Sequence, residues 1–289
     1  MGMAILGATG QLGHRTVEAI LARGTAAEQV VAAVRTPSSA ADLLARDVEV
    51  RAADYDDPDS LKEAFTGCER VLLIPTSAPP SLRVRQYDNA IAAATAAGVR
   101  HLVHYGFVPT TVESPFQITP FLLYAESALR MSGLAWTVLR NGVFMDPIVD
   151  WVPTIVKMKT IPFPTGNGRC AYITRDDIAR AAAVVMTTSG HEETVYNLTG
   201  PKALTTAQLC GAVAKATGKP VKPRPASGLD YVEACRSSGV STEATQVRLS
   251  MYRTIREGHL DVVSKDFNTL TGQPAEGFTT YLARRLEEF

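Results

Sequence analysis

The sequence predicts an α/β fold in which a doubly wound parallel sheet carries helices on both faces. Short apolar runs alternate with longer amphipathic runs over the first half of the chain, which is the pattern of repeated βα units. A glycine-rich turn stands between the first apolar run and the first amphipathic run. The chain has 289 residues, of which 46% are hydrophobic and 20% are charged. This composition indicates a globular protein with one large domain or two coupled ones.

Each of the first five predicted strands is followed by a predicted helix. The strands are predicted at residues 4–6, 29–34, 48–52, 71–74, 101–105 and 136–139. The helices between them are predicted at residues 11–23, 38–45, 59–65, 83–97 and 120–131. Asp57-Pro58 marks the start of the third helix, and Gly98 marks the end of the fourth.

After residue 141 the rhythm of the sequence changes. Prolines and a Gly-Asn-Gly turn interrupt residues 146–168, and the chain becomes rich in predicted helix beyond Gly200. A helix at 175–187 and a strand at 195–198 return to the sheet. We therefore predict a sheet domain of residues 1–141 and 175–200, and a smaller α-rich substrate lobe of residues 142–174 and 201–289. The last helices are predicted at 205–217, 229–237, 244–257 and 279–287.

The turn after the first strand has the sequence Gly-Ala-Thr-Gly-Gln-Leu-Gly, from residue 7 to residue 13. Glycine permits a positive φ in such a turn and lets the backbone approach a pyrophosphate closely. The helix that follows offers free N–H groups and the positive end of its dipole to phosphate. This position predicts a Rossmann-type NAD(P)-binding domain. Its expected contacts in this turn are Gly7, Thr9, Gly10, Gln11, Leu12 and Gly13.

The end of the second strand indicates which dinucleotide binds. NAD-binding proteins place Asp or Glu there, where it accepts hydrogen bonds from the ribose 2′-OH. This chain has Arg35, about 20 residues past the glycine turn. A guanidinium can bind a 2′-phosphate bidentately, so we expect NADP(H) to be preferred over NAD(H), although a solvated surface arginine is the alternative. Asp54 and Tyr55 are expected near the adenine, unless Asp54 caps a helix, and Pro75 and Thr76 complete the predicted site.

Several segments, taken in order, carry a resemblance that spans nearly the whole chain. They are the turn at 7–13, Val-Arg at 34–35, Ala-Asp-Tyr at 53–55, Leu-Arg-Asn at 139–141, Tyr-Ile-Thr-Arg-Asp-Asp-Ile-Ala at 172–179 and Tyr-Asn-Leu-Thr-Gly at 196–200. In this combination the chain resembles the NmrA-like atypical short-chain dehydrogenases. Within them it is most similar to the bacterial NAD(P)H:quinone reductase and triphenylmethane-dye reductase branch. The resemblance implies an NADP-preferring Rossmann domain, a small C-terminal substrate lobe and a cleft between them.

The catalytic pair of the standard short-chain dehydrogenases is missing. Those enzymes use Tyr-x-x-x-Lys, in which the lysine lowers the pKa of the tyrosine so that the phenol can exchange a proton. Here Tyr124 is followed four residues later by Ala128, and Tyr105 has no such lysine either. These two tyrosines are therefore only weak catalytic candidates. Hydride transfer to an acceptor that stabilises its own charge, such as a quinone, an azo compound or a cationic dye, does not need that relay.

A substrate pocket is expected beside the carboxyl ends of the late strands, where open α/β sheets bind ligands. The candidates are Tyr105, Phe107, Phe116, Tyr124, Asn141, Phe144, Met145 and Trp151; taken singly, each is better explained as core or interface packing, and only together do they indicate a pocket. His101 and His104 lie in a predicted strand, where a hydrogen-bonded structural histidine is expected. Asp176 and Asp177 are interpreted as helix-start residues.

The leading hypothesis is an NADPH-dependent oxidoreductase that transfers hydride to a small aromatic, quinone-like, azo or dye-like acceptor. A non-catalytic NADP(H)-sensing regulator of the NmrA type also fits the missing pair. An epimerase acting on sugar nucleotides is the third hypothesis, against which Ala128 argues. The sequence names neither the acceptor nor the oligomeric state, and a homodimer stays open.

The charge balance and the cysteines exclude several other classes. Lys plus Arg and Asp plus Glu number 29 each, which argues against a nucleic-acid partner bound through a large basic surface. The four cysteines are far apart and form no pattern of a metal or disulfide site, so we expect reduced core thiols and no metal. No apolar run is long enough for a membrane span and no secretion signal is found, so we expect a cytoplasmic protein.

Overall fold

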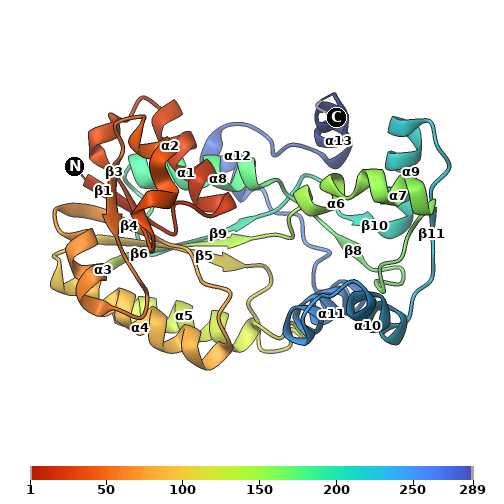
Figure 1. Cartoon of the computed structure of the whole chain (residues 1–289), viewed down its shortest axis with the longest axis horizontal. Coiled ribbons are helices and arrows are strands. Elements are labelled where there is room, and N and C mark those ends of the chain that lie inside the picture. Colours follow the sequence, from red (N-terminus) through yellow and green to blue (C-terminus); the bar gives the residue numbers. More distant parts are fainter. Residues whose placement is uncertain (1, 288–289) are drawn as a thin grey trace.

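The computed structural model describes residues 2–287, so the ends of the predicted domain ranges, residues 1, 288 and 289, lie outside the described part. Within these residues the central sheet has seven strands in the order β3-β2-β1-β4-β5-β6-β9 (Figure 1). Every pairing in it is parallel, which confirms the predicted fold class. The strands are β1 (Gly2–Leu6), β2 (Val30–Val34), β3 (Glu49–Ala52), β4 (Cys68–Leu73), β5 (His101–Phe107), β6 (Ala135–Asn141) and β9 (Thr194–Leu198).

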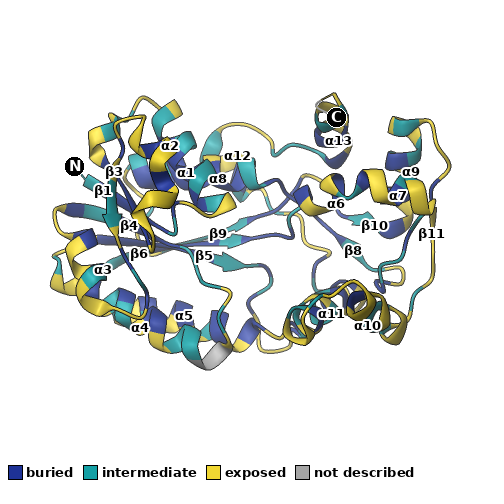
Figure 2. Ribbon diagram, viewed as in Figure 1, coloured by how far each residue is buried: buried dark blue, intermediate teal, exposed yellow. Residues whose placement is uncertain are grey.

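Helices cover both faces of the sheet (Figure 1), and much of the sheet is buried between them (Figure 2). Apolar side chains of the strands are divided between the two faces. In β1, Ile5 packs toward one helical layer while Ala4 and Leu6 pack toward the other. The first layer contains α1 (Gln11–Ala22), α2 (Ala41–Leu44), α8 (Arg175–Thr187) and α12 (Asp266–Thr271). The second layer contains α3 (Pro58–Phe65), α4 (Pro80–Ala96) and α5 (Thr119–Met131).

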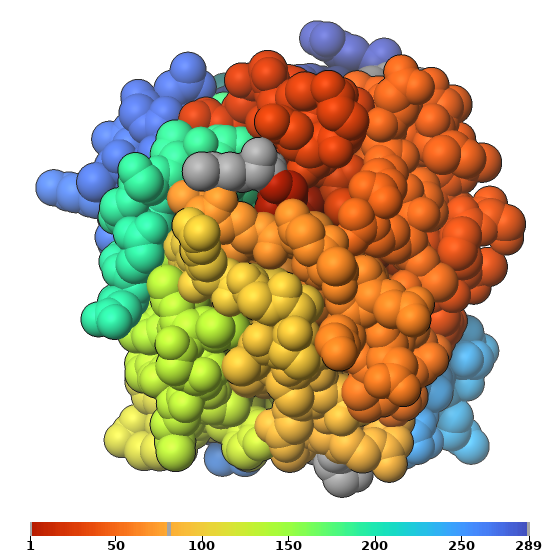
Figure 3. Space-filling model, turned by 90° about the vertical axis from the view of Figure 1, so that its left-hand side faces the viewer, coloured from red at the N-terminus to blue at the C-terminus, as the bar shows by residue number. Residues whose placement is uncertain are grey.

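The strand order reverses beside β1, and this reversal positions the site. β2 lies on one side of β1 and β4 lies on the other. In open α/β sheets a crevice forms at such a switch point, outside the carboxyl ends of the strands. Figure 3 shows the opposite end of the molecule, the left-hand side of Figure 1, where the surface is formed mostly by the first half of the chain.

Several predicted bounds differ from the observed ones by a few residues, and two of these differences are instructive. β4 begins at Cys68 rather than at residue 71, because polar residues stand where the sequence pattern calls for apolar ones. One of them, Arg70, donates hydrogen bonds to the Val185 and Thr188 carbonyls at the end of α8, so it belongs to the sheet although it is charged. The helix predicted at 38–45 is a 3-10 turn, Pro37–Ala40, followed by the short α2.

The remaining elements lie beside the sheet and share a separate apolar cluster, with side chains from residues 143–172 and 204–286. We propose this part as the substrate lobe. It excludes α12, which lies within the predicted range of the lobe but packs on helix α8 and strand β9 of the sheet domain. All four cysteines are buried free thiols. The elements of the lobe are α6 (Asp146–Asp150), α7 (Val152–Met158), β7 (Thr160–Ile161), β8 (Arg169–Cys170), β10 (Leu204–Thr205), α9 (Thr206–Thr217), β11 (Lys222–Pro223), α10 (Gly228–Ser237), α11 (Thr242–Arg256) and α13 (Phe278–Leu286).

A substitution at Gly13 tests how closely α1 approaches the turn before it. A Cβ at this position would lie 2.2 Å from the Gly7 carbonyl oxygen and 2.9 Å from the Ala8 Cα. Because both neighbours are backbone atoms, we expect Gly13→Ala to lower the free energy of unfolding by roughly 1–3 kcal/mol.

The matched control is Gly211→Ala, in the middle of α9, where a Cβ meets nothing within 4 Å. It should raise the free energy of unfolding by about 0.5–1 kcal/mol, because glycine is a poor helix former. Urea denaturation of both variants measures the contrast. If Gly13→Ala is as stable as the wild type, the close approach of α1 to the turn before it does not require glycine at position 13.

Candidate functional site

The turn after β1 needs glycine at two positions. Gly7 has a φ of +86°, which favours glycine, and its N–H donates to the Ala33 carbonyl at 2.9 Å. Its carbonyl accepts from the Gly10 N–H at 3.0 Å, which closes the turn. Gly13 then packs its Cα against this carbonyl, leaving no room for a Cβ. The start of α1 is thereby held against the carboxyl end of β1.

The N-terminus of α1 is left without a cap. Gly10 occupies the N-cap position and has no side chain to accept from the first N–H groups, and the first turn of the helix carries no acidic residue. Thr9, Gly10 and Gln11 are exposed. An uncapped helix start with free N–H groups and a positive dipole end fits a phosphate.

The neighbouring helix α8 shows the opposite arrangement at its own start. The Thr174 hydroxyl accepts from the Asp177 N–H at 2.9 Å, and a carboxylate oxygen of Asp146 accepts from the Arg175 N–H at 3.1 Å. Asp176 and Asp177 add two further negative charges in the first turn, as the sequence predicts for helix-start residues. An anion is therefore favoured at the start of α1 and disfavoured at the start of α8.

Arg35 is placed as the sequence predicts. It directly follows β2 and is exposed, and within residues 2–287 its side chain has no hydrogen-bond or ion-pair partner. In the same helical layer, a ring nitrogen of His14 on α1 lies 2.6 Å from the Asp42 carboxylate on α2. A guanidinium with no partner in the described part of the chain, at the end of the second strand, can bind a phosphate bidentately.

The other predicted cofactor residues shape the loops after β3 and β4. Asp57, and not Asp54, caps α3, while Asp54 accepts from the Asp56 N–H at 2.9 Å. The Tyr55 hydroxyl donates to the Ile74 carbonyl at 2.8 Å, and burial raises the pKa of this phenol. Pro75 follows Ile74 in the partly buried loop. The next residue, Thr76, donates to the Gln86 side chain at 2.7 Å.

The surroundings of the two weak catalytic candidates, Tyr105 and Tyr124, do not favour proton donation. Tyr105 is buried, with its hydroxyl 2.8 Å from the Thr16 hydroxyl on α1, and burial raises its pKa. Tyr124 lies on α5, in the helical layer opposite α1 (Figure 1), and donates to Asp88 on α4. The hydrogen bond to this carboxylate, with some desolvation, raises the pKa of Tyr124 to about 12. A phenol with such a pKa is a poor acid at neutral pH.

Of the two histidines in β5, only one is hydrogen-bonded as expected. A ring nitrogen of His101 lies 2.8 Å from the Thr137 hydroxyl. His104 is fully buried, and within residues 2–287 neither of its ring nitrogens has a hydrogen-bond partner, so the expectation is wrong for this residue. Burial lowers the pKa of His104 to about 4, which keeps the ring neutral at physiological pH.

The pocket candidates separate into different surroundings. Phe107 packs against Phe116 with ring centres 4.7 Å apart. Met145 is fully buried in the core of the lobe. Trp151 stacks on Phe163 at 6.0 Å, also within the lobe. These contacts are typical of packing.

Two candidates at the end of β6 retain features of a binding site. Asn141 is buried, and within the described residues its side-chain oxygen has no hydrogen-bond partner. Such an orphaned acceptor fits a ligand that brings an N–H or O–H donor. Phe144 lies under the Arg175 guanidinium, with the central carbon 4.8 Å from the ring centre. Sequence reasoning missed Arg175, because no local pattern connects it to the glycine turn.

A small polar hollow of about 110 Å³, here called the small hollow, joins the glycine turn to the lobe. Its lining brings together α1, α6, α8 and α13, which are far apart in the sequence. The lining residues are Gln11, Arg15, Asp146, Asp150, Arg175, Tyr281 and Arg285.

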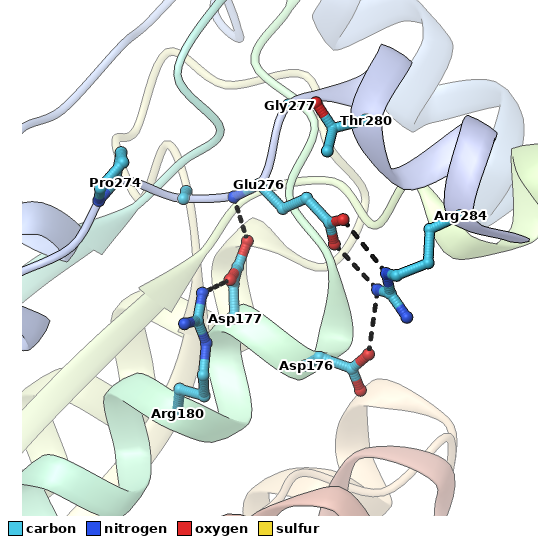
Figure 4. Close-up of a pocket in the computed structure, with 9 residues that line it drawn as sticks. Asp176, Asp177, Arg180, Pro274, Glu276, Gly277, Thr280 and Arg284 are labelled. Atoms are coloured by element: carbon cyan, nitrogen blue, oxygen red, sulfur yellow. Dashed lines mark hydrogen bonds and ion pairs between the residues drawn. The ribbon is translucent and has the colours of Figure 1, made fainter.

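A larger hollow, of about 470 Å³, lies between α8 and the segment before α13 (Figure 4). Its charges are paired with one another. Arg284 binds Glu276 and Asp176, while Asp177 binds Arg180 and accepts from the Glu276 N–H. We interpret the ion pairs that line this large hollow as structural contacts that hold α13 against the sheet domain.

The residues at the carboxyl edge of the sheet therefore fit a dinucleotide. A turn that only glycine can form meets an uncapped helix start, Arg35 offers a cation, and Asn141 offers an orphaned acceptor. These features could hold a pyrophosphate, a 2′-phosphate and a hydrogen-bond donor, respectively.

Comparisons with known proteins agree with this geometry. Residues 7–189 match the family described as NAD(P)H-binding. Quinone oxidoreductase 2 of Escherichia coli K12 is 35% identical, and the match covers 97% of this chain and 96% of that protein. An E. coli NADPH-dependent quinone oxidoreductase complexed with NADPH has a TM-score of 0.93 at 33% identity, with 98% and 99% covered. Citrobacter sp. triphenylmethane reductase has a TM-score of 0.94 at 30% identity, with both chains fully covered. NAD(P)H azoreductase of Xenophilus azovorans is 28% identical, with 96% and 95% covered.

The titration of Tyr124 tests the local electrostatics. Removing the charge of its partner with Asp88→Asn should lower the pKa of the phenol from about 12 toward its ordinary value of ~10. Carbon-13 NMR of labelled tyrosine rings measures the titration, and Tyr124→Phe assigns the signal. An unchanged midpoint in Asp88→Asn would show that the carboxylate does not hold this phenol.

Proposed function

The chain belongs to the NAD(P)H-binding family, and from this premise we propose that it is an NADPH-dependent reductase of quinone-like, azo or dye-like acceptors. The observation that carries the proposal is the glycine turn at the uncapped start of α1, with Arg35 at the end of the neighbouring strand. Similarity over nearly the whole length to a quinone oxidoreductase, an azoreductase and a triphenylmethane reductase supports the acceptor class.

Each part of the site has a distinct binding task in this proposal. When bound, the cofactor supplies the hydride that reduces the acceptor. The N–H groups at the start of α1 hold the pyrophosphate, and Arg35 binds the 2′-phosphate. Asn141 accepts a hydrogen bond from the ligand at the end of β6. The protein thus binds and orients the reactants, while the reaction itself needs no Tyr–Lys pair.

The missing proton relay separates this proposal from epimerase chemistry. Ala128 stands where the lysine belongs, and Tyr105 and Tyr124 are both engaged by neighbours, Thr16 and Asp88. A non-catalytic NADP(H) sensor would lack the relay too, so turnover decides between the sensor and the reductase.

Other predictions about the protein's setting remain open. A homodimer, a cytoplasmic location and the absence of nucleic-acid partners stay predictions. Among the helices of residues 2–287, none combines the length and the apolar character needed to cross a membrane.

Arg35→Asp tests the cofactor choice. A charge-assisted hydrogen bond contributes roughly 1.5–3 kcal/mol, so the wild type should bind NADPH roughly ten- to a hundredfold more tightly than NADH. The variant should lose or reverse this preference, because a carboxylate repels the 2′-phosphate and accepts from the 2′-OH.

Calorimetry with both cofactors measures the effect. The control is Arg100→Asp, the same charge change at an exposed arginine just before β5, at the opposite edge of the sheet. Equal affinities of the wild type for NADPH and NADH would contradict the assignment of Arg35.

A panel of acceptors tests the reaction itself. NADPH oxidation should be measured with quinones, azo dyes and cationic triphenylmethane dyes, and we expect turnover with at least one class. In single-turnover experiments, Tyr105→Phe and Tyr124→Phe should each keep the rate within about tenfold, whereas removing a general acid typically costs ~10²–10⁴-fold. No turnover with any class would favour the sensor, and a hundredfold loss in either variant would reinstate a tyrosine relay.

A further inference from the structure

The small hollow contains a guanidinium that is held firmly in place. The Arg175 side chain is 15% exposed, and its guanidinium lies over the Phe144 ring at 4.8 Å. One oxygen of Asp146 lies 3.5 Å from an Arg175 side-chain nitrogen, and the other accepts from the Arg175 backbone N–H at 3.1 Å. An aromatic face and a buried carboxylate thus fix the position of this cation.

Asp146 and Arg175 have unused hydrogen-bonding capacity. The Asp146 side chain is 3% exposed, and within residues 2–287 its Oδ1 has no hydrogen-bond partner. In the same part of the chain, the guanidinium of Arg175 donates no hydrogen bond, although the group carries five N–H donors. A cation that is mostly buried and open to a hollow in this way fits a ligand that brings an acceptor oxygen.

The other arginines of the small hollow already donate hydrogen bonds to the protein. Arg15 donates to Asp176 and to the Gln11 carbonyl, and Arg285 donates to Asp150. Gln11 lies in the first turn of α1, so the small hollow borders the part of the proposed cofactor site that would hold the pyrophosphate. Arg175 is therefore the cation best placed to meet an acceptor that enters beside the cofactor.

We propose that Arg175 contacts the oxygen of a neutral acceptor and stabilises the negative charge that this oxygen gains as hydride arrives. Asp146 and Phe144 act as positioning residues that hold the guanidinium. This inference rests on the proposed reductase function. It assigns to a fixed cation the charge stabilisation that a Tyr–Lys pair gives in related chemistry.

The chemistry depends on the charge of the acceptor. Transfer of hydride to a neutral quinone breaks the donor C–H bond and forms an O–H bond at one quinone oxygen. The two electrons leave the negative charge of a hydroquinone monoanion on the other oxygen, which then takes a proton from water. Transfer to a triphenylmethane cation forms a C–H bond at its central carbon and leaves a neutral product. Arg175 should therefore assist the quinone reaction and give no such help with the cationic dye.

The first experiment compares two acceptors in Arg175→Gln. We expect kcat with 1,4-naphthoquinone to fall roughly a hundredfold, in the range found when one oxyanion-stabilising donor is removed. With the cationic dye malachite green, kcat should stay within about threefold of the wild type, because no anion develops.

The chain offers a closely matched control in Arg180→Gln. Arg180 lies on the same helix, pairs with Asp177 and sits 5.4 Å over the Phe267 ring, but it lines the large hollow (Figure 4). Its loss should leave the ratio of the two acceptor rates unchanged. An equal loss with both acceptors in Arg175→Gln would show that Arg175 only supports the fold, and the proposal would be overturned.

A binding measurement without turnover gives an independent readout. The anion of 2-hydroxy-1,4-naphthoquinone, which is stable at neutral pH, should bind the wild type at least tenfold more tightly than neutral 2-methoxy-1,4-naphthoquinone. Arg175→Gln should lose this preference and Arg175→Lys should keep part of it, because lysine retains the charge but not the planar fork. An unchanged preference in Arg175→Gln would overturn the proposal.

The two experiments also separate failure of this inference from failure of the proposed function. If the wild type oxidises NADPH with none of the quinones, azo dyes and triphenylmethane dyes of the panel, the proposed function is wrong and the catalytic role of Arg175 falls with it. If the wild type reduces both and the variants behave alike with both, the reductase stands and the role of Arg175 is contradicted.

Discussion

The close approach of α1 to the turn before it is the constraint on which the site depends. With no Cβ at Gly13, the helix can lie against the Gly7 carbonyl, so its first N–H groups emerge at the carboxyl edge of the sheet. α1 packs along α8 in the same layer, and Arg15 joins them through Asp176. The position of this one helix thus determines where a phosphate can bind and where the small hollow opens.

Charge placement then distinguishes two helix starts that lie close together. The start of α8 is capped by Thr174 and Asp146 and has two acidic residues in its first turn. The start of α1 has a glycine at its N-cap and no acidic residue in its first turn. Helix dipoles attract anions wherever the first turn is not already neutralised. The same carboxylate that caps α8, Asp146, also fixes Arg175 beside the small hollow. Asp146 therefore both caps α8 and holds the Arg175 guanidinium near the start of α1. This arrangement would explain how the site could stabilise the negative charge of the acceptor without a Tyr–Lys pair.

Features with a local cause could be predicted from the sequence. The alternation of apolar runs gives the parallel sheet, and the turn at 7–13 gives the helix start, because each depends on a few adjacent residues. Arg35 is found by its place after a strand. The 3-10 turn at Pro37–Ala40 and the polar start of β4 depend on tertiary contacts instead, such as those of Arg70 with the end of α8.

The acceptor side of the site was harder to predict, since its residues come from distant segments. Tyr105 stands at a strand end, as the pocket pattern requires, but strand alternation points its hydroxyl at Thr16. Met145 lies in the apolar cluster of the lobe, and Trp151 packs against the same cluster. Asp146 and Arg175 are 29 residues apart, and no periodicity connects them.

A crystal structure of the chain with NADPH tests the central claim most directly, because it locates the phosphates. The account predicts the pyrophosphate on the N–H groups at the start of α1 and the 2′-phosphate on the guanidinium of Arg35. A pyrophosphate bound elsewhere, at the capped start of α8 or in the large hollow of Figure 4, would contradict it.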